Sequence, residues 1–204
     1  MHPNPIYRRE SRDRNLAFAR DVGFGALAVP APDAAPLVAQ APFVFNDDGT
    51  LDLHLMRSNP VMRAAPAFAT LIVQGPHGYI SPDWYGMADQ VPTWNYVAVH
   101  LTGRVDPLPQ DRLRPVLDRL AEEYERRLLP KPIWTSDKVP EEIMTRLMRA
   151  IQPLRMQLTG VEGTWKLAQN KPADARRGAA EGLEQAALLP GAAALAAWMR
   201  AVTD

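Results

Sequence analysis

Hydrophobic and polar positions alternate in several short runs of the chain and recur at helical spacing in others. In the clearest alternating run, Leu51, Leu53 and Leu55 share one face, while Asp52 and His54 share the other. Because successive side chains of a strand point to opposite faces, this run predicts a half-buried strand. The Asn-Asp-Asp-Gly sequence just before it predicts a tight turn.

Further strands are predicted where apolar and β-branched residues cluster between turn signals. They span residues 25–29, 37–45, 68–74, 95–105 and 154–161. Gly75-Pro76 is expected to end the third of them. Helices are predicted over residues 15–22, 111–129, 141–150, 173–187 and 191–202, and Ser58-Asn59-Pro60 is expected to open a short one.

The order of these elements indicates the fold class. Strands do not alternate regularly with helices, so a doubly wound sheet is not favoured. About six antiparallel strands with flanking helices predict a mainly β, α+β protein built as a small barrel with a helical layer. We expect one domain over residues 1–204, with barrel strands at about 24–106 and 153–167 and helical parts at about 110–150 and 172–202.

Charge and cysteine content limit the possible partners. Lys and Arg number 23, as do Asp and Glu, so the net charge is zero. A chain-wide grip on DNA is not expected, because neutralising phosphates requires clustered excess Lys and Arg. The chain has no cysteine, which excludes disulfides and thiolate metal sites and fits the reducing cytoplasm. The polar N-terminus and the interrupted apolar run 186–202 predict a soluble, cytoplasmic protein with no membrane span.

Aromatic and polar residues are densest between Gln74 and Asn95. One interpretation is an ordered loop that caps the barrel. The other is a ligand wall, in which aromatic rings stack on a planar ligand while His77, Ser81 and Thr93 supply hydrogen bonds. The residues alone favour the two equally.

Two further segments have candidate binding chemistry. From His54 to Pro60 a strand runs into a helix start, where Arg57 can clamp a phosphate; the alternative is a plain capped helix with a solvated arginine. Residues 163–172 combine an aromatic ring, a cation and two amides. They form either a solvated connector or the polar edge of a site, including one in a partner subunit.

Other kinds of site have little support. The four histidines form no two-His helical motif, so a metal site is not expected. No nucleophile-elbow motif supports a Ser-His-Asp triad, and no dinucleotide or P-loop motif occurs.

Taken together, these segments resemble the PaiB-like family, FMN-binding proteins described as negative transcriptional regulators. The resemblance runs from Pro3 to about Leu183. It rests on residues 74–85, on Val91-Pro-Thr-Trp-Asn-Tyr96, on His54…Arg57…Asn59-Pro60 and on Lys166-Leu-Ala-Gln-Asn170. The chain departs from the family pattern at Gln40, where the family has His, and at Ala168, where it has Ser.

The resemblance implies an FMN-binding split β-barrel with C-terminal helices, related to pyridoxamine 5'-phosphate oxidases and flavin reductases. It also implies a homodimer with FMN at the subunit interface, the phosphate near Arg57, and Lys166 and Gln169 reaching FMN from the other subunit. The implied FMN-binding residues are His54, Arg57, Ser58, Asn59, Gln74, His77, Thr93, Trp94, Asn95, Lys166 and Gln169. No catalytic residue is implied.

Three functions agree with these features. The first is an FMN-binding regulator, and the second is a flavin-dependent oxidoreductase or flavin reductase acting on a small substrate. The third is a haem-handling split barrel, which His54, His77 and His100 keep open. Direct DNA binding is not favoured, since five acidic residues offset the five arginines of helix 111–129 and no helix-turn-helix stands out.

Overall fold

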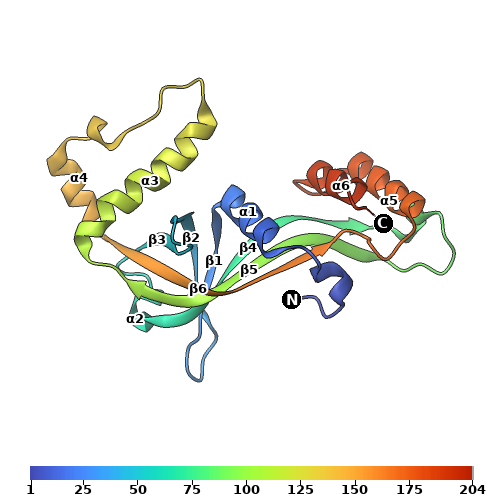
Figure 1. Cartoon of the computed structure of the whole chain (residues 1–204), viewed down its shortest axis with the longest axis horizontal. Coiled ribbons are helices and arrows are strands. Elements are labelled where there is room, and N and C mark those ends of the chain that lie inside the picture. Colours follow the sequence, from blue (N-terminus) through green and yellow to red (C-terminus); the bar gives the residue numbers. More distant parts are fainter. Residues whose placement is uncertain (204) are drawn as a thin grey trace. The chain divides into compact units, whose positions relative to one another are not determined.

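The computed structural model describes residues 1–203, and its six strands close a barrel. The strands are β1 (Phe24–Val29), β2 (Leu37–Phe45), β3 (Leu51–Met56), β4 (Ala67–Ile80), β5 (Thr93–Pro107) and β6 (Ile151–Lys166) (Figure 1). Their order around the barrel is β1-β2-β3-β6-β5-β4, and β1 pairs antiparallel with both β2 and β4. The predicted α+β class with a barrel is confirmed.

The helices also follow the prediction closely. They are α1 (Arg12–Val22), α2 (Val61–Ala64), α3 (Leu113–Glu125), α4 (Glu141–Met148), α5 (Ala173–Ala186) and α6 (Ala192–Arg200). The short helix begins at Val61, later than predicted, with Pro60 at the N-cap and the Asn59 side chain accepting from Val61 N at 3.0 Å. Among the described residues, none of the helices combines the length and apolar character needed to cross a membrane.

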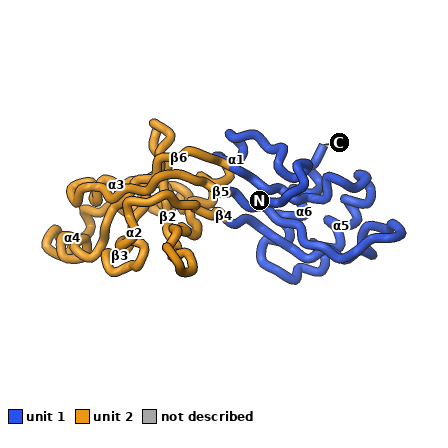
Figure 2. The backbone as a smooth tube through the Cα atoms, turned by 90° about the horizontal axis from the view of Figure 1, so that it is seen from below, with its two compact units in different colours: residues 1–17, 74–99, 162–204 blue, residues 18–73, 100–161 orange. Residues whose placement is uncertain are grey.

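The chain divides into two compact units, which Figure 2 distinguishes by colour. Unit 1 comprises residues 1–17, 74–99 and 162–204, and unit 2 comprises residues 18–73 and 100–161. The strands β4, β5 and β6 each contribute residues to both units. A single domain over residues 1–204 stays a prediction.

Two strands, β4 and β6, extend furthest beyond their predicted ranges. The expected stop of β4 at Gly75-Pro76 is wrong, because the strand continues to the fully buried Ile80. Gly78 explains part of this extension, since a Cβ there would lie 2.6 Å from a methyl group of Leu183 in α5. The strand can therefore pass directly beneath the helix. β6 likewise extends to Lys166 and buries Trp165.

A buried carboxylate holds unit 2 together. The three leucines of β3 are buried as predicted, but the expected exposure of Asp52 on the opposite face is wrong, because its side chain is fully buried. Arg155 lies opposite Asp52 on β6 and donates two hydrogen bonds to the carboxylate, at 2.7 and 2.9 Å. Arg119 of α3 donates a third hydrogen bond, so the carboxylate joins β3, β6 and α3.

The ionisation of Asp52 reflects this environment. Burial alone would raise the pKa of the carboxyl, but hydrogen bonds from Arg155, Asn46 and Arg119 outweigh burial and hold the pKa below its ordinary value. The folded state therefore keeps this group ionised at neutral pH.

In unit 1, α5 and α6 lie side by side (Figure 1). The contact between α5 and the turn Pro82–Tyr85 depends on two glycines. A Cβ at Gly182 would lie 2.4 Å from the ring of Trp84, and one at Gly178 would lie 2.6 Å from the Trp84 carbonyl oxygen. Trp84 therefore has a packing role, as the loop interpretation of the aromatic segment expects.

We predict that Asp52→Asn lowers the free energy of unfolding at pH 7 by about 2–4 kcal/mol, since it removes the charge that both arginines require. A lowered folded pKa adds stability above the unfolded pKa of about 4, and this stability is lost as pH falls through the folded pKa. Urea denaturation should therefore show the difference from wild type shrinking below about pH 4. Asp118→Asn, which breaks a solvent-exposed pair with Arg114, is the control and should change stability by less than about 1 kcal/mol.

We also predict that Gly182→Ala destabilises the protein by about 1–3 kcal/mol through overlap with the Trp84 ring. In an unconstrained helix the same change would stabilise by about 1 kcal/mol. In a Trp84→Ala background the overlap is absent, so thermal denaturation should show the effect of Gly182→Ala reversing its sign. Destabilisation of equal size in both backgrounds would contradict this packing role.

Candidate functional site

Four of the predicted site residues lie in unit 2, at the end of β3. The Arg57 guanidinium is exposed and donates to the Arg149 carbonyl oxygen at 3.0 Å and to the Gln110 side chain. Ser58 is exposed. Arg57 is therefore held in place by its own unit while part of the guanidinium still faces solvent.

His54 is the most enclosed member of this group. Its Nδ1 atom is buried and has no hydrogen-bond partner among the described residues. Burial lowers the pKa of the imidazole, so the neutral form is favoured at neutral pH. A neutral ring offers one donor and one acceptor, which suits a polar contact better than charge neutralisation.

The other seven predicted residues lie in unit 1, and those on β5 point to two different faces. Thr93 and Asn95 share one face, whereas Trp94 between them is 49% exposed on the other. Trp94 lies near the rings of His77 and Tyr79, with centroid distances of 6.2 Å to each. Thr93 and Trp94 therefore lie on different faces of β5, and the ligand wall stays a prediction.

A cavity of about 220 Å³, here called the lysine cavity, lies on the Thr93 and Asn95 face. It is lined by Tyr7, Tyr85, Asp89, Gln90, Val91, Thr93, Asn95, Lys166, Ala168, Asn170 and Lys171. Its charged groups are two ammonium groups and one exposed carboxylate. The cavity thus brings together three of the predicted residues, Thr93, Asn95 and Lys166.

Lys166 is positioned by β5. Its Nζ donates to the Thr93 hydroxyl and, at 2.8 Å, to the Trp94 carbonyl oxygen, and it lies 5.9 Å from the centre of the Tyr7 ring. Burial lowers the pKa of the ammonium group. An ammonium group has three N–H bonds, so one remains for a ligand.

Gln169 serves the loop that follows β6. Its Oε1 accepts from Leu167 N at 2.8 Å, and its Nε2 donates to the Trp165 carbonyl oxygen. Ala168, which lies between Leu167 and Gln169 in the sequence, has a φ of +63°. Few residues with a Cβ adopt this conformation. Gln169 thereby stabilises the turn that presents Lys166, and its side chain lines a separate cavity of about 230 Å³.

Asn95 is 1% exposed, and only one end of its amide is paired. Its Nδ2 donates to Met199 Sδ of α6 at 3.5 Å. Its Oδ1 is buried and has no partner among the described residues. Such an atom usually costs about 1–3 kcal/mol of stability, so its presence in a cavity lining points to a ligand.

The sequence did not reveal every residue of this cavity. Tyr7 and Tyr85 come from two 3₁₀ turns, and Lys171 follows the Lys166–Asn170 run directly. The second lysine could have been included from its spacing. No sequence pattern links Met199 with Asn95, because they are 104 residues apart.

Sequence comparisons match this chain to one protein family and to individual relatives. Residues 1–160 match the family described as "Putative FMN-binding domain". The chain is 31% identical over 159 residues to "Protease synthase and sporulation protein PAI 2" of Bacillus subtilis, covering 76% of this chain and 75% of that protein. An uncharacterized protein of Aspergillus fumigatus is 25% identical over 223 residues, covering 82% and 85% of the two chains.

Solved structures agree on the fold. The FAD and haem binding protein from Mycobacterium smegmatis has a TM-score of 0.57 at 18% identity, covering 78% of this chain and 73% of that one. The flavocytochrome from Azotobacter vinelandii has a TM-score of 0.56 at 16% identity, covering 81% and 72%. The split-barrel fold is therefore confirmed, and this chain belongs to the family described as a putative FMN-binding domain.

Proposed function

We propose that this protein is a homodimeric, cytoplasmic FMN-binding regulator that acts through its flavin and does not itself hold DNA. The lysine cavity is the observation that carries this proposal. It lies in a chain of the FMN-binding family and contains a buried acceptor that the described residues leave unpaired.

The residues present fit part of an FMN molecule. FMN combines an anionic phosphate with a planar ring whose edge carries both donors and acceptors. The lysine cavity supplies two ammonium groups, a hydroxyl and the free amide oxygen of Asn95, while Arg57 offers an exposed guanidinium for a phosphate. Bound FMN would supply two-electron transfer chemistry, which the side chains lack.

The cavity volume supports sharing of FMN between two copies. Ligand pockets usually measure roughly 300–1,000 Å³, whereas the lysine cavity measures about 220 Å³. A molecule as large as FMN therefore needs further surface. We propose that Arg57 and its neighbours on one copy hold the phosphate, while Lys166 belongs to the other copy and Gln169 positions it.

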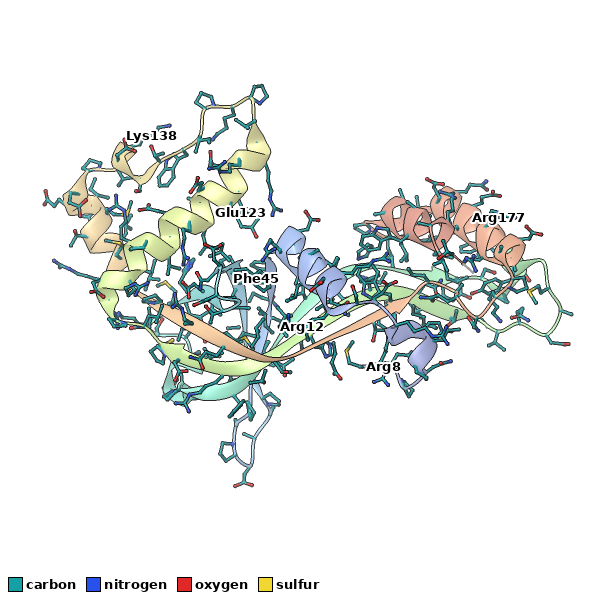
Figure 3. All side chains as sticks on the ribbon, viewed as in Figure 1. Arg8, Arg12, Phe45, Glu123, Lys138 and Arg177 are labelled. Carbon is teal, nitrogen blue, oxygen red and sulfur yellow. The ribbon has the colours of Figure 1, made fainter. Side chains whose placement is uncertain are left out.

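The arginines near α3 argue against direct DNA binding. Four of them pair with carboxylates: Arg114 with Asp118 and Glu141, Arg119 with Asp52, Arg126 with Glu122, and Arg127 with Asp21 and Glu123. Glu123, labelled on α3 in Figure 3, pairs with Arg127 at 2.8 Å. Because phosphate binding needs uncompensated cations, this helix offers DNA little attraction.

A flavin-dependent oxidoreductase is the second candidate. At the rim of the lysine cavity, Val91 is 74% exposed and Asn170 is exposed as well. An open rim of this kind leaves room for a small substrate beside a bound flavin.

We predict that Arg57→Ala weakens FMN binding by about 1.5–3 kcal/mol through loss of a charge-assisted phosphate contact, and that Lys166→Met also weakens it. A dimer made of one Arg57→Ala chain and one Lys166→Met chain should regain one tight site, because one of its two sites has both residues intact. Flavin fluorescence titration of this mixed dimer, isolated with two different tags, should give half a tight site per chain.

The matched control pairs a wild-type chain with a chain that carries both substitutions. It should have no intact site if the two residues act from different copies. A tight site in this control alone would contradict sharing but leave FMN binding in place. Absence of FMN binding by the wild-type protein would contradict the whole proposal.

We further predict a yellow protein with a flavin absorption spectrum that gives no gel shift with the DNA upstream of its own gene at physiological salt. A Soret band would indicate haem instead. Steady oxidation of NADH or NADPH by the yellow protein would favour the oxidoreductase, and a shift specific to that DNA would contradict indirect regulation.

A further inference from the structure

Three described side chains have a buried polar atom without a hydrogen-bond partner: His54 Nδ1, Arg119 Nε and Asn95 Oδ1. Arg119 already bonds Asp52 and Asn46 through its other nitrogens. Whether His54 Nδ1 requires a donor or an acceptor depends on the tautomer, since a neutral imidazole nitrogen either donates or accepts a hydrogen bond. Asn95 is the one of the three that lines the lysine cavity.

The orientation of the Asn95 amide follows from its neighbour. A thioether sulfur has lone pairs but no hydrogen to donate, so the group nearest Met199 Sδ should be the NH₂ end of the amide. Rotating the amide would place its oxygen against sulfur and leave both groups without a donor. Met199 therefore keeps the carbonyl oxygen as the unpaired atom, and this atom requires a ligand that donates a hydrogen.

This requirement separates two parts of FMN. A doubly ionised phosphate, the main form at neutral pH, has only acceptor oxygens, so it cannot satisfy Asn95 Oδ1. The pyrimidine edge of the flavin ring presents an N3–H donor flanked by two carbonyl oxygens. That pattern matches the Asn95 acceptor together with the remaining N–H of Lys166.

We propose that the lysine cavity receives the pyrimidine edge of the flavin, with Asn95 Oδ1 accepting from N3–H and Lys166 donating to a neighbouring carbonyl oxygen. This inference rests on the proposed FMN binding and identifies the part of FMN that enters the cavity. Asn95 is then a residue that recognises the flavin ring, and Met199 orients its amide. The lowered pKa of Lys166 agrees with an enclosed ammonium group that loses little hydration when a ligand binds.

Three flavins test the assignment by fluorescence titration: FMN, riboflavin and 3-methylriboflavin. Riboflavin lacks the phosphate, and 3-methylriboflavin lacks the N3–H. Wild type should bind 3-methylriboflavin about tenfold or more weakly than riboflavin, as expected for loss of one buried hydrogen bond. This arm requires no variant, so the inference can fail even if a substitution prevents folding.

Asn95→Leu and Lys166→Met should each weaken FMN and riboflavin by the same factor, about tenfold. Asn95→Leu should also bind riboflavin and 3-methylriboflavin equally well. Arg57→Ala, by contrast, should weaken FMN and leave riboflavin unchanged. The control is Lys138→Met, which alters an exposed lysine of unit 2 (Figure 3) and should change no flavin affinity.

Stability without flavin separates ligand reading from a structural role. Removing an unpaired buried oxygen relieves its desolvation, so Asn95→Leu should keep or raise the melting temperature of the flavin-free protein while it loses flavin affinity. Loss of both would indicate a structural residue and overturn the inference.

Two other outcomes are decisive. If Lys166→Met and Asn95→Leu weaken the binding of FMN but not that of riboflavin, the cavity binds the phosphate. The inference then fails, while FMN binding by the protein stands. If wild type binds none of the three flavins, the proposed function itself fails.

Discussion

The buried carboxylate of Asp52 sets the electrostatics of unit 2. An ionised group with no exposure is stable only when hydrogen bonds replace its lost hydration, and Arg155 and Arg119 supply them from β6 and α3. The helix is therefore bound to the barrel through one of its arginines. The same contact compensates the charge of that arginine, so the interaction that stabilises the unit also reduces its attraction for nucleic acid.

Unit 1 uses its polar groups differently. The side chain of Gln169 forms hydrogen bonds with backbone atoms of its own loop. Two of the three N–H bonds of Lys166 donate to atoms of β5. These contacts hold the ammonium group in place before any ligand arrives, so less conformational entropy is lost on binding. Of the residues first associated with FMN, Gln169 therefore shapes the loop of the site. Lys166 retains one N–H bond for contact with a ligand.

Local patterns in the sequence predicted the strands and helices well, because alternation, helical spacing and turn residues act over a few positions. The leucines of β3 and the end of α1 at Val22 are examples. Contacts between distant segments were missed. The burial of Asp52 depends on two arginines that lie 67 and 103 residues away, and β4 continues past Gly75-Pro76 because α5 covers Gly78. Neither partner can be identified from the pattern around the residue itself.

The candidate site also depends on a contact between distant segments that the sequence does not predict. The resemblance to a known family selected Asn95 and Lys166, but nothing in the sequence shows that one oxygen of Asn95 lacks a partner. That property arises from Met199, which occupies the donor end of the amide from a helix outside the matched residues 1–160. A buried polar atom that is satisfied by its own chain, as in Asp52, adds to folding stability. A buried polar atom without a partner, such as Asn95 Oδ1, reduces folding stability. Binding of a ligand with a matching donor would recover that loss. Helix α6 therefore does more than cover unit 1, because its Met199 determines which hydrogen bond a ligand must supply.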